Sequence, residues 1–137
     1  MKVFFDTSAF VKRYVNEAGS QAVVEICQNA DTVALSIICL PEIISTLRRL
    51  VREGNLSEQQ YHNIKVLILN DFEDIDICEL TSEVMLHIIS CLETNSLRAM
   101  DAIHLGCALA YAPDKFVSSD KRQINAAHAV GLTVVEV

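Results

Sequence analysis

The sequence predicts one α/β domain in which parallel strands alternate with amphipathic helices. Short apolar runs of strand length are separated by segments of helical periodicity, and connections of that length join parallel strands through right-handed crossovers. The chain has 137 residues, of which 51% are hydrophobic, with 4 Gly and 2 Pro. This length and composition fit a single packed core and exclude a disordered or fibrous chain. We therefore expect one domain over residues 1–137.

The first half of the chain is expected to hold two strands and four helices. A strand over 2–5 precedes a short helix over 8–15, and a helix over 19–29 repeats apolar residues on one face. A strand over 32–36 leads to a helix over 41–52, whose first turn can hold Pro41 because a missing N–H is no loss there. Gly54 ends that helix. Ser57 and Gln60 then form a capping box for a helix that runs to about residue 70.

The second half continues the alternation. The expected elements, in order, are a strand over 75–78, helices over 81–93 and 99–111, a strand over 116–118, a helix over 121–130 and a closing strand over 133–137. No internal repeat, low-complexity tract or linker interrupts them. The acidic stretch DFEDIDICE around the third of these strands is expected to be a solvated edge.

Charge and cysteine usage indicate a cytoplasmic protein that does not bind membranes. Lys and Arg number 11 against 18 Asp and Glu, a net charge of −7 that disfavours non-specific binding to nucleic acid but leaves room for a local basic rim. The five cysteines form no C-x-x-C pair, which favours reduced, buried thiols over a disulfide framework or a zinc site. Asp6 interrupts the first apolar run after three residues, unlike a signal peptide, and no uncharged stretch approaches the roughly 20 residues that span a bilayer.

Four carboxylates stand where the neighbouring residues are apolar: Asp6, Glu42, Asp101 and Asp120. Asp6 and Asp120 follow predicted strands, and ligands of parallel sheets gather at the carboxyl ends of their strands. Four acids converging in apolar surroundings would be costly without a counter-ion. A hard divalent cation removes that cost, and Mg²⁺ or Mn²⁺ prefers carboxylate oxygens.

Each of these acids also has a purely structural interpretation. Asp6 and Asp120 suit helix N-caps, the latter in a capping box with Gln123, while Glu42 and Asp101 suit first turns, where they complement the helix dipole. Capping and metal ligation are compatible, because a capping carboxylate can still present its second oxygen to a metal. The sequence therefore predicts a metal site in which some ligands also cap helices.

Taken in order, FFDTSAF, LPEII, RAMDAIHLGCALA and FVSSDKR resemble the PIN-domain nucleases, and in particular the VapC-type toxin ribonucleases of toxin–antitoxin pairs. The resemblance covers essentially the whole chain. It implies a three-layer α/β/α sandwich with a central parallel sheet and a Mg²⁺- or Mn²⁺-dependent hydrolysis of RNA. It also implies a small antitoxin and a second copy of the chain as partners, for which the apolar segments 43–51 and 64–69 offer candidate surfaces.

Carried over residue by residue, the resemblance assigns catalysis and metal binding to Asp6, Glu42, Asp101 and Asp120. It places small hydroxyls near the metal or its waters, at Thr7 or Ser8 and at Ser118 or Ser119. Some members of the family have a further acid after the last aspartate. Here Lys121, Arg122, Gln123 and Ile124 occupy those positions, so that ligand is missing and the sequence does not decide between one metal and two.

Basic residues close to the four acids predict phosphate contacts, and Arg13, Arg98 and Arg122 are the candidates. His104 lies one helical turn after Asp101 and is interpreted either as a ligand or general base or, preferably, as a core histidine satisfied by a neighbour. The non-enzymatic alternative is a PIN-like module that binds RNA or protein without cutting. A haloacid-dehalogenase phosphatase would need a second Asp where Ser8 stands, and a receiver domain a phosphoacceptor where the third strand runs into Cys78–Glu79.

Overall fold

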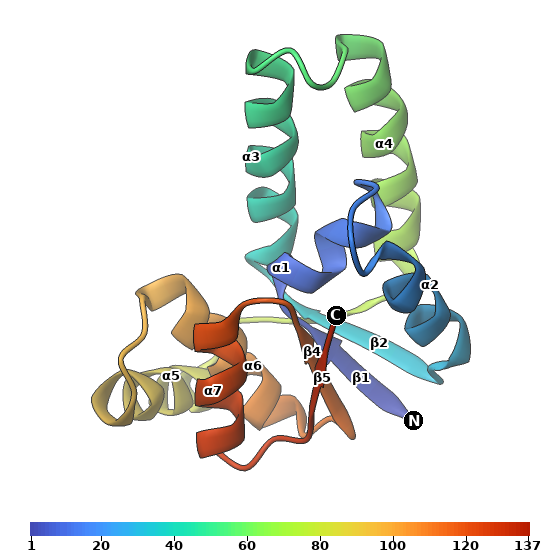
Figure 1. Cartoon of the computed structure of the whole chain (residues 1–137). Coiled ribbons are helices and arrows are strands. Elements are labelled where there is room, and N and C mark those ends of the chain that lie inside the picture. Colours follow the sequence, from blue (N-terminus) through green and yellow to red (C-terminus); the bar gives the residue numbers. More distant parts are fainter.

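The computed structural model describes residues 1–137 and is built on one parallel sheet. Its five strands follow the spatial order β3-β2-β1-β4-β5 (Figure 1). They are β1 (Lys2–Phe5), β2 (Thr32–Ser36), β3 (Asp76–Cys78), β4 (Lys115–Ser118) and β5 (Val134–Glu136). Every neighbouring pair is parallel, as the alternation of strands and helices predicts.

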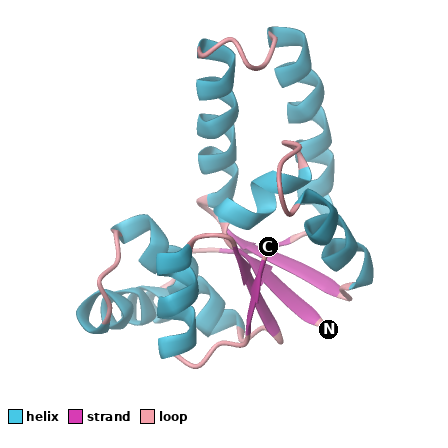
Figure 2. Cartoon of the chain, in the orientation of Figure 1, coloured by secondary structure: helices cyan, strands magenta, loops and turns pink.

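Helices cover both faces of this sheet, which confirms the three-layer sandwich (Figure 2). One face carries α1 (Thr7–Phe10), α2 (Ser20–Asn29), α3 (Cys39–Arg52) and α4 (Glu58–Asp71), with the 3₁₀ turns η1 (Val11–Arg13) and η2 (Phe72–Asp74). The other carries α5 (Ser82–Thr94), α6 (Ala99–Tyr111) and α7 (Lys121–Ala129). In Figure 1, α3 and α4 extend beyond the sheet as a helical hairpin. None of the helices combines the length and apolar composition needed to cross a bilayer.

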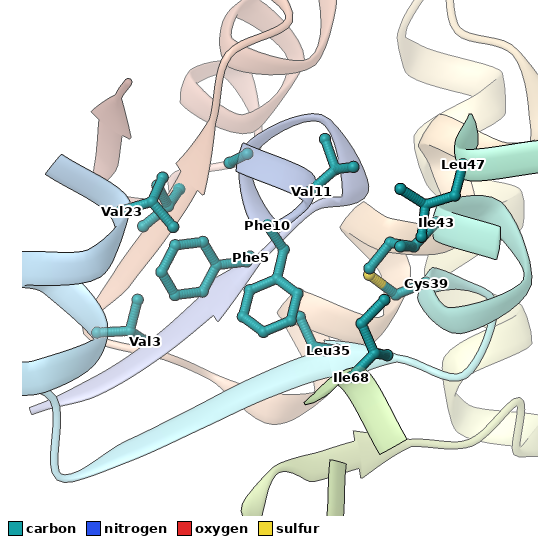
Figure 3. Packing of buried hydrophobic residues seen from close by; sticks show 12 residues of the cluster. Val3, Phe5, Phe10, Val11, Val23, Leu35, Cys39, Ile43, Leu47 and Ile68 are labelled. Carbon is teal, nitrogen blue, oxygen red and sulfur yellow. The ribbon is translucent and has the colours of Figure 1, made fainter. Parts of the chain in front are cut away.

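The central strand β1 divides its side chains between two cores. Val3 and Phe5 enter the cluster beneath α1–α4, whereas Phe4 enters the cluster beneath α5–α7. This follows from the two-residue period of a strand, which sends successive side chains to opposite faces. Figure 3 shows Phe5 and Phe10 together in the first cluster, with ring centroids 5.4 Å apart. After the exposed Lys2, the rest of β1 is buried on both faces and apolar, and Asp6 is the first polar residue after it.

Two helices differ from the sequence prediction by more than a shift of one residue at an end. The helix expected over 8–15 divides into α1 and η1, and it begins at Thr7 because Asp6 caps the N–H of Ala9. The helix expected from residue 41 begins at Cys39, and Pro41 is its third residue. The missing N–H of Pro41 still has no consequence, since the first-turn amides have no intrahelical acceptor. The capping box at Ser57 is confirmed.

Gly106 permits the close approach of α6 to α5. A Cβ at this position would lie 2.4 Å from Cγ1 and 2.9 Å from the backbone N of Ile88. We expect Gly106→Ala to destabilise the protein by about 1–3 kcal/mol through overpacking, despite a gain in helix propensity of up to about 1 kcal/mol. Urea denaturation followed by circular dichroism measures this. The exposed α7 substitution Asn125→Ala is the control, and equal stability of the two variants would contradict the packing described.

Candidate active site

A polar cavity at the carboxyl end of the sheet collects all four predicted acids. It has a volume of about 320 Å³ and no hydrophobic lining residue. Its lining residues are Asp6, Thr7, Ser8, Glu42, Ser45, Thr46, Asp101, His104 and Asp120. Two acids come from strand ends, after β1 and β4, and two from the first turns of α3 and α6. Residues up to 114 positions apart in the chain thus face one space.

Asp6 is the most deeply buried of the four acids, with 3% of its surface exposed. Its Oδ1 accepts hydrogen bonds from Ser8 Oγ at 2.7 Å and from the N–H of Ala9 at 3.0 Å, and its Oδ2 accepts from Ser118 Oγ at 2.6 Å. Burial raises the pKa of Asp6 above its ordinary value, although these bonds and the proximity of His104 act in the opposite direction. The carboxylate is therefore held in one orientation, with one lone pair of Oδ2 still free.

The predicted hydroxyls surround these acids. Ser8 and Ser118 both bond to Asp6, and Thr7 donates from Oγ1 to Glu42 Oε1 at 2.7 Å. Ser119 has a different role: its N–H donates to Ser8 Oγ at 3.1 Å and its Oγ donates to the Ser8 carbonyl at 3.0 Å. Ser119 thus links the end of β4 to α1 and makes no hydrogen bond to any of the four acids.

Glu42 is half-buried and held through one oxygen only. Its Oε1 accepts from Thr7 Oγ1 and from His104 Nε2, the latter at 2.6 Å, while Oε2 has no protein partner. Burial raises the pKa of Glu42, but the hydrogen bonds from His104 and Thr7 outweigh it, and the net pKa lies below the ordinary value. Glu42 is therefore ionised at neutral pH.

Asp101 and Asp120 both line the cavity, from the first turn of α6 and from the residue before α7. Burial raises the pKa of Asp101, and the nearby charge of Asp120 raises it further. The Asp101 side chain accepts no protein hydrogen bond. Asp120 caps α7 by accepting at Oδ1 from the N–H groups of Arg122 and Gln123, at 2.8 and 3.3 Å, and its Oδ2 is left unbonded.

The capping box expected at Asp120 is only half formed. The Gln123 side chain does not return to the N–H of Asp120, which donates instead to Ser118 Oγ at 3.1 Å. Gln123 Nε2 donates to the backbone carbonyl of Asp101 at 3.0 Å. This bond links the start of α7 to the first turn of α6.

A hard divalent cation fits this donor set. Every acid retains carboxylate oxygen capacity that no protein donor uses, and the facing charges of Asp101 and Asp120 are of the kind that a cation neutralises. Imidazole and thiolate, which select softer metals, are not among the free donors: the cavity has no cysteine, and Nε2 of its one histidine is bonded to Glu42. No group of three or more acidic, histidine or cysteine side chains is placed closely enough to hold a metal ion as it stands. The four acids share one cavity without forming a preassembled metal site.

A second cavity, of about 630 Å³, adjoins the first and adds positive charge. It shares Glu42, Asp101 and Asp120 with the polar cavity and is otherwise lined by Arg98, Ala99, Met100, Lys121 and Arg122. Two of the three predicted phosphate contacts, Arg98 and Arg122, therefore lie beside the acids. Arg13 lines neither cavity, and its Nε donates to Asp71 at 3.0 Å.

Three cavity residues were not assigned to the site from the sequence. Ser45 and Thr46 lie three and four positions after Glu42, on the same face of α3, and this helical spacing is the signal that could have found them. His104 is buried and hydrogen-bonded, as the preferred interpretation predicts, but the neighbour that satisfies it is an acid of the site. The acidic stretch 71–79 lines no part of either cavity, and most of its residues are exposed.

The sequence model of the PIN-domain family matches residues 3–129 of the chain. The chain belongs to the PIN-domain family. Ribonuclease VapC45 of Mycobacterium tuberculosis is 32% identical to it over 138 aligned residues, which cover 96% of this chain and 93% of the relative. The relatives are thus VapC-type PIN proteins of nearly the same length as this chain.

Solved PIN structures share the fold along the whole chain. The sarcin–ricin-loop-cleaving toxin VapC20 of M. tuberculosis aligns with a TM-score of 0.69 at 16% identity, covering 98% of both chains. A chain of a toxin–antitoxin complex from Klebsiella pneumoniae aligns with a TM-score of 0.70 at 14% identity, covering 98% of this chain and 99% of that one. At these identities the likeness concerns the fold of the PIN domain.

Proposed function

We propose that this PIN-domain protein is a divalent-metal-dependent endoribonuclease that hydrolyses RNA phosphodiester bonds as the toxin of a type II toxin–antitoxin pair. The observation that carries the proposal is the pair of adjoining cavities, one lined by four acids and the other adding three cations to three of the same acids. An acidic metal pocket beside a basic rim suits a phosphodiester substrate. The ribonuclease names of the VapC relatives support RNA as that substrate.

Each acid has a role that follows from its contacts. Asp6 is fixed by Ser8 and Ser118, and Glu42 by Thr7 and His104, so both present a defined oxygen to the cavity. Asp101 and Asp120 contribute two further carboxyl groups, and the charge of Asp120 raises the pKa of Asp101. Mg²⁺ or Mn²⁺ bound by these four side chains would supply Lewis-acid activation of water and stabilisation of the leaving oxygen.

Arg98 and Arg122 would bind the backbone of the RNA. We expect Arg98→Ala and Arg122→Ala each to weaken RNA binding and to lower the slope of log affinity against log salt by about 0.7, as expected for one lost phosphate contact with a single strand. Fluorescence anisotropy with a catalytically inactive background, such as Asp101→Asn, measures both quantities. The control is Arg52→Ala, at the far end of α3. If the slope of log affinity against log salt is unchanged in both Arg98→Ala and Arg122→Ala, these arginines do not contact the phosphates of the RNA.

The reaction itself is tested by the ends of its products. Cleavage of an RNA pool with Mg²⁺ or Mn²⁺ in water labelled with heavy oxygen should place one label on each new terminal phosphate. Attack by the ribose 2′-hydroxyl would instead give unlabelled cyclic phosphates. Labelled ends support hydrolysis; unlabelled cyclic ends would overturn it. RNA that is bound without being cut, across diverse pools, would favour the non-cleaving alternative.

The proposed partners are RNA, a small antitoxin and a second copy of this chain, in the cytoplasm. The antitoxin is supported by the toxin–antitoxin complex from Klebsiella pneumoniae among the structural relatives. Exposed apolar side chains offer surfaces for protein partners: Val66, Leu67 and Leu69 on α4, and Met85, Leu86, Ile89 and Leu92 on α5. The segment 64–69 named from the sequence contributes three of them, whereas Ile43 and Leu47 of the segment 43–51 are core residues.

A further inference from the structure

We propose that His104 is a positioning residue for Glu42: its Nε2–H fixes one carboxylate oxygen so that the other is presented to a divalent cation. This inference rests on the proposed function, in which Glu42 is a metal ligand. It assigns to His104 an action through Glu42, with no direct contact to metal or RNA. Four features of the structure lead to it.

The first feature is the direction of the hydrogen bond. His104 Nε2 lies 2.6 Å from Glu42 Oε1 and 3.1 Å from Thr7 Oγ1. Thr7 uses its own hydroxyl hydrogen on Oε1, at 2.7 Å. An ionised carboxylate only accepts hydrogen bonds, so Nε2 must carry the proton and donate. Oε1 is then saturated by two donors, and Oε2 is the oxygen that remains for a ligand.

The second feature is the burial of the ring. His104 is 3% exposed, whereas 32% of the Glu42 side chain is exposed. The histidine is packed in place, and the glutamate lies on the cavity wall, where a ligand can reach it. A buried donor therefore holds the orientation of a more exposed acceptor, as preorganised active sites require.

The third feature is an unpaired nitrogen. His104 Nδ1 is buried without a hydrogen-bond partner, and such a group costs free energy. Leucine would fill a similar space without that cost. The packing of α6 therefore gains little from an imidazole at this position, and the bond to Glu42 is what the ring supplies.

The fourth feature is the placement along α6. Asp101 and His104 are three residues apart, so they lie on one face of the helix, and both line the polar cavity. One rigid helix thus carries an acid of the site together with the anchor of a second acid on α3. The bond from His104 to Glu42 therefore couples the position of Glu42 to the helix that carries Asp101.

The test compares His104→Leu, which removes the donor, with His104→Gln, whose side-chain amide can reach the place of Nε2. Isothermal titration of the RNA-free full chain with Mg²⁺ or Mn²⁺ reports metal affinity, and cleavage kinetics report kcat and KM separately. We expect His104→Leu to weaken metal binding by about 10–100-fold, to lower kcat at saturating RNA with little change in KM at fixed metal, and to melt close to the wild-type temperature. His104→Gln should restore metal affinity to within a few-fold.

The decisive control is the same substitution in a Glu42→Gln background. A residue that acts only through Glu42 should add no further loss of metal affinity there. An additive loss, a His104→Gln variant as impaired as His104→Leu, or a wild-type metal affinity in His104→Leu would each overturn the proposal. The exposed α7 substitution His128→Leu controls for adventitious binding by histidine, and His104→Met replaces His104→Leu if the latter does not fold.

The same titration separates this inference from the proposed function. Protein that binds Mg²⁺ with the expected His104 dependence but cuts no RNA would overturn the activity and support the positioning role. Wild-type protein that cuts RNA, together with a His104→Leu variant that binds metal normally, would support the activity and overturn the positioning role. Wild-type protein that binds neither Mg²⁺ nor Mn²⁺ would overturn both.

Discussion

Asp101→Asn is expected to reduce RNA cleavage by at least about 100-fold and to leave the fold intact. Lewis-acid catalysis by a bound metal is worth several kcal/mol, and each 1.36 kcal/mol corresponds to about tenfold in rate. The Asp101 side chain makes no protein hydrogen bond, so the substitution removes charge and a ligand oxygen without breaking a structural contact. Single-turnover cleavage measures the loss. Asp74→Asn, an exposed acid outside both cavities, is the matched control.

The same substitution should raise the stability of the metal-free protein at neutral pH. The folded-state pKa of Asp101 lies above its ordinary value of 3.8 because of burial and of Asp120. An acid with a raised pKa contributes stability that is present below the unfolded pKa and is lost as the pH rises through the folded pKa. Ionised Asp101 therefore destabilises the fold at neutral pH, and asparagine removes that charge. Thermal melts in EDTA should show a higher melting temperature for Asp101→Asn than for wild type, with the difference shrinking as the pH falls toward 3.8.

Added Mg²⁺ should narrow or reverse this difference in melting temperature between Asp101→Asn and wild type. Saturating Mg²⁺ stabilises a folded state that binds it, so wild type should gain more melting temperature than Asp101→Asn. A variant that cleaves RNA within about tenfold of wild type, or one that gains as much from Mg²⁺, would contradict the assignment of Asp101 as a ligand.

Phe5→Ala is expected to have the largest effect on stability. Phe5 is fully buried in the central strand, paired in register with Leu35 of β2 and Val117 of β4. Truncating a buried phenylalanine costs about 3–5 kcal/mol, against a total stability of about 5–15 kcal/mol for a typical domain. Urea denaturation followed by circular dichroism should therefore show a large loss of stability in Phe5→Ala.

This substitution also links the core to the site, because the next residue is Asp6. Leu67→Ala is the control, since Leu67 is 57% exposed on α4 and such surface substitutions change stability by about 0.5 kcal/mol or less. Equal losses in the two variants would show that β1 is not the centre of the core.

The sheet and its helices could be predicted because their signals are local. Apolar runs such as Val3–Phe5 and the helical periodicity of 19–29 report burial directly, and an all-parallel order follows from their alternation. The starts of α1 and α3, at Thr7 and Cys39, lie one and two residues before the predicted ones. The first follows from the local cap by Asp6, which the sequence offers, whereas the second has no side-chain cap to mark it.

The four acids of the site could be predicted because a carboxylate in apolar surroundings costs free energy and is seldom found there without a partner or a cation. The hydrogen bonds that connect the residues of the site could not be predicted. The pairing of His104 with Glu42, of Gln123 with the Asp101 carbonyl and of Arg13 with Asp71 each joins residues 22 to 62 positions apart. Such contacts depend on how α3, α4, α6 and α7 are placed around the sheet, which no local pattern specifies.

The central claim is that four carboxylates hold a metal with which RNA is cut, and one cleavage assay tests it most directly. Purified protein is incubated with a mixed RNA pool in Mg²⁺ or Mn²⁺, in EDTA, and in EDTA followed by excess metal, beside Asp101→Asn prepared in the same way. We predict cleavage with metal, none in EDTA, recovery on adding metal back, and a loss of at least about 100-fold in Asp101→Asn with metal. Cleavage that survives both EDTA and the substitution would contradict the account.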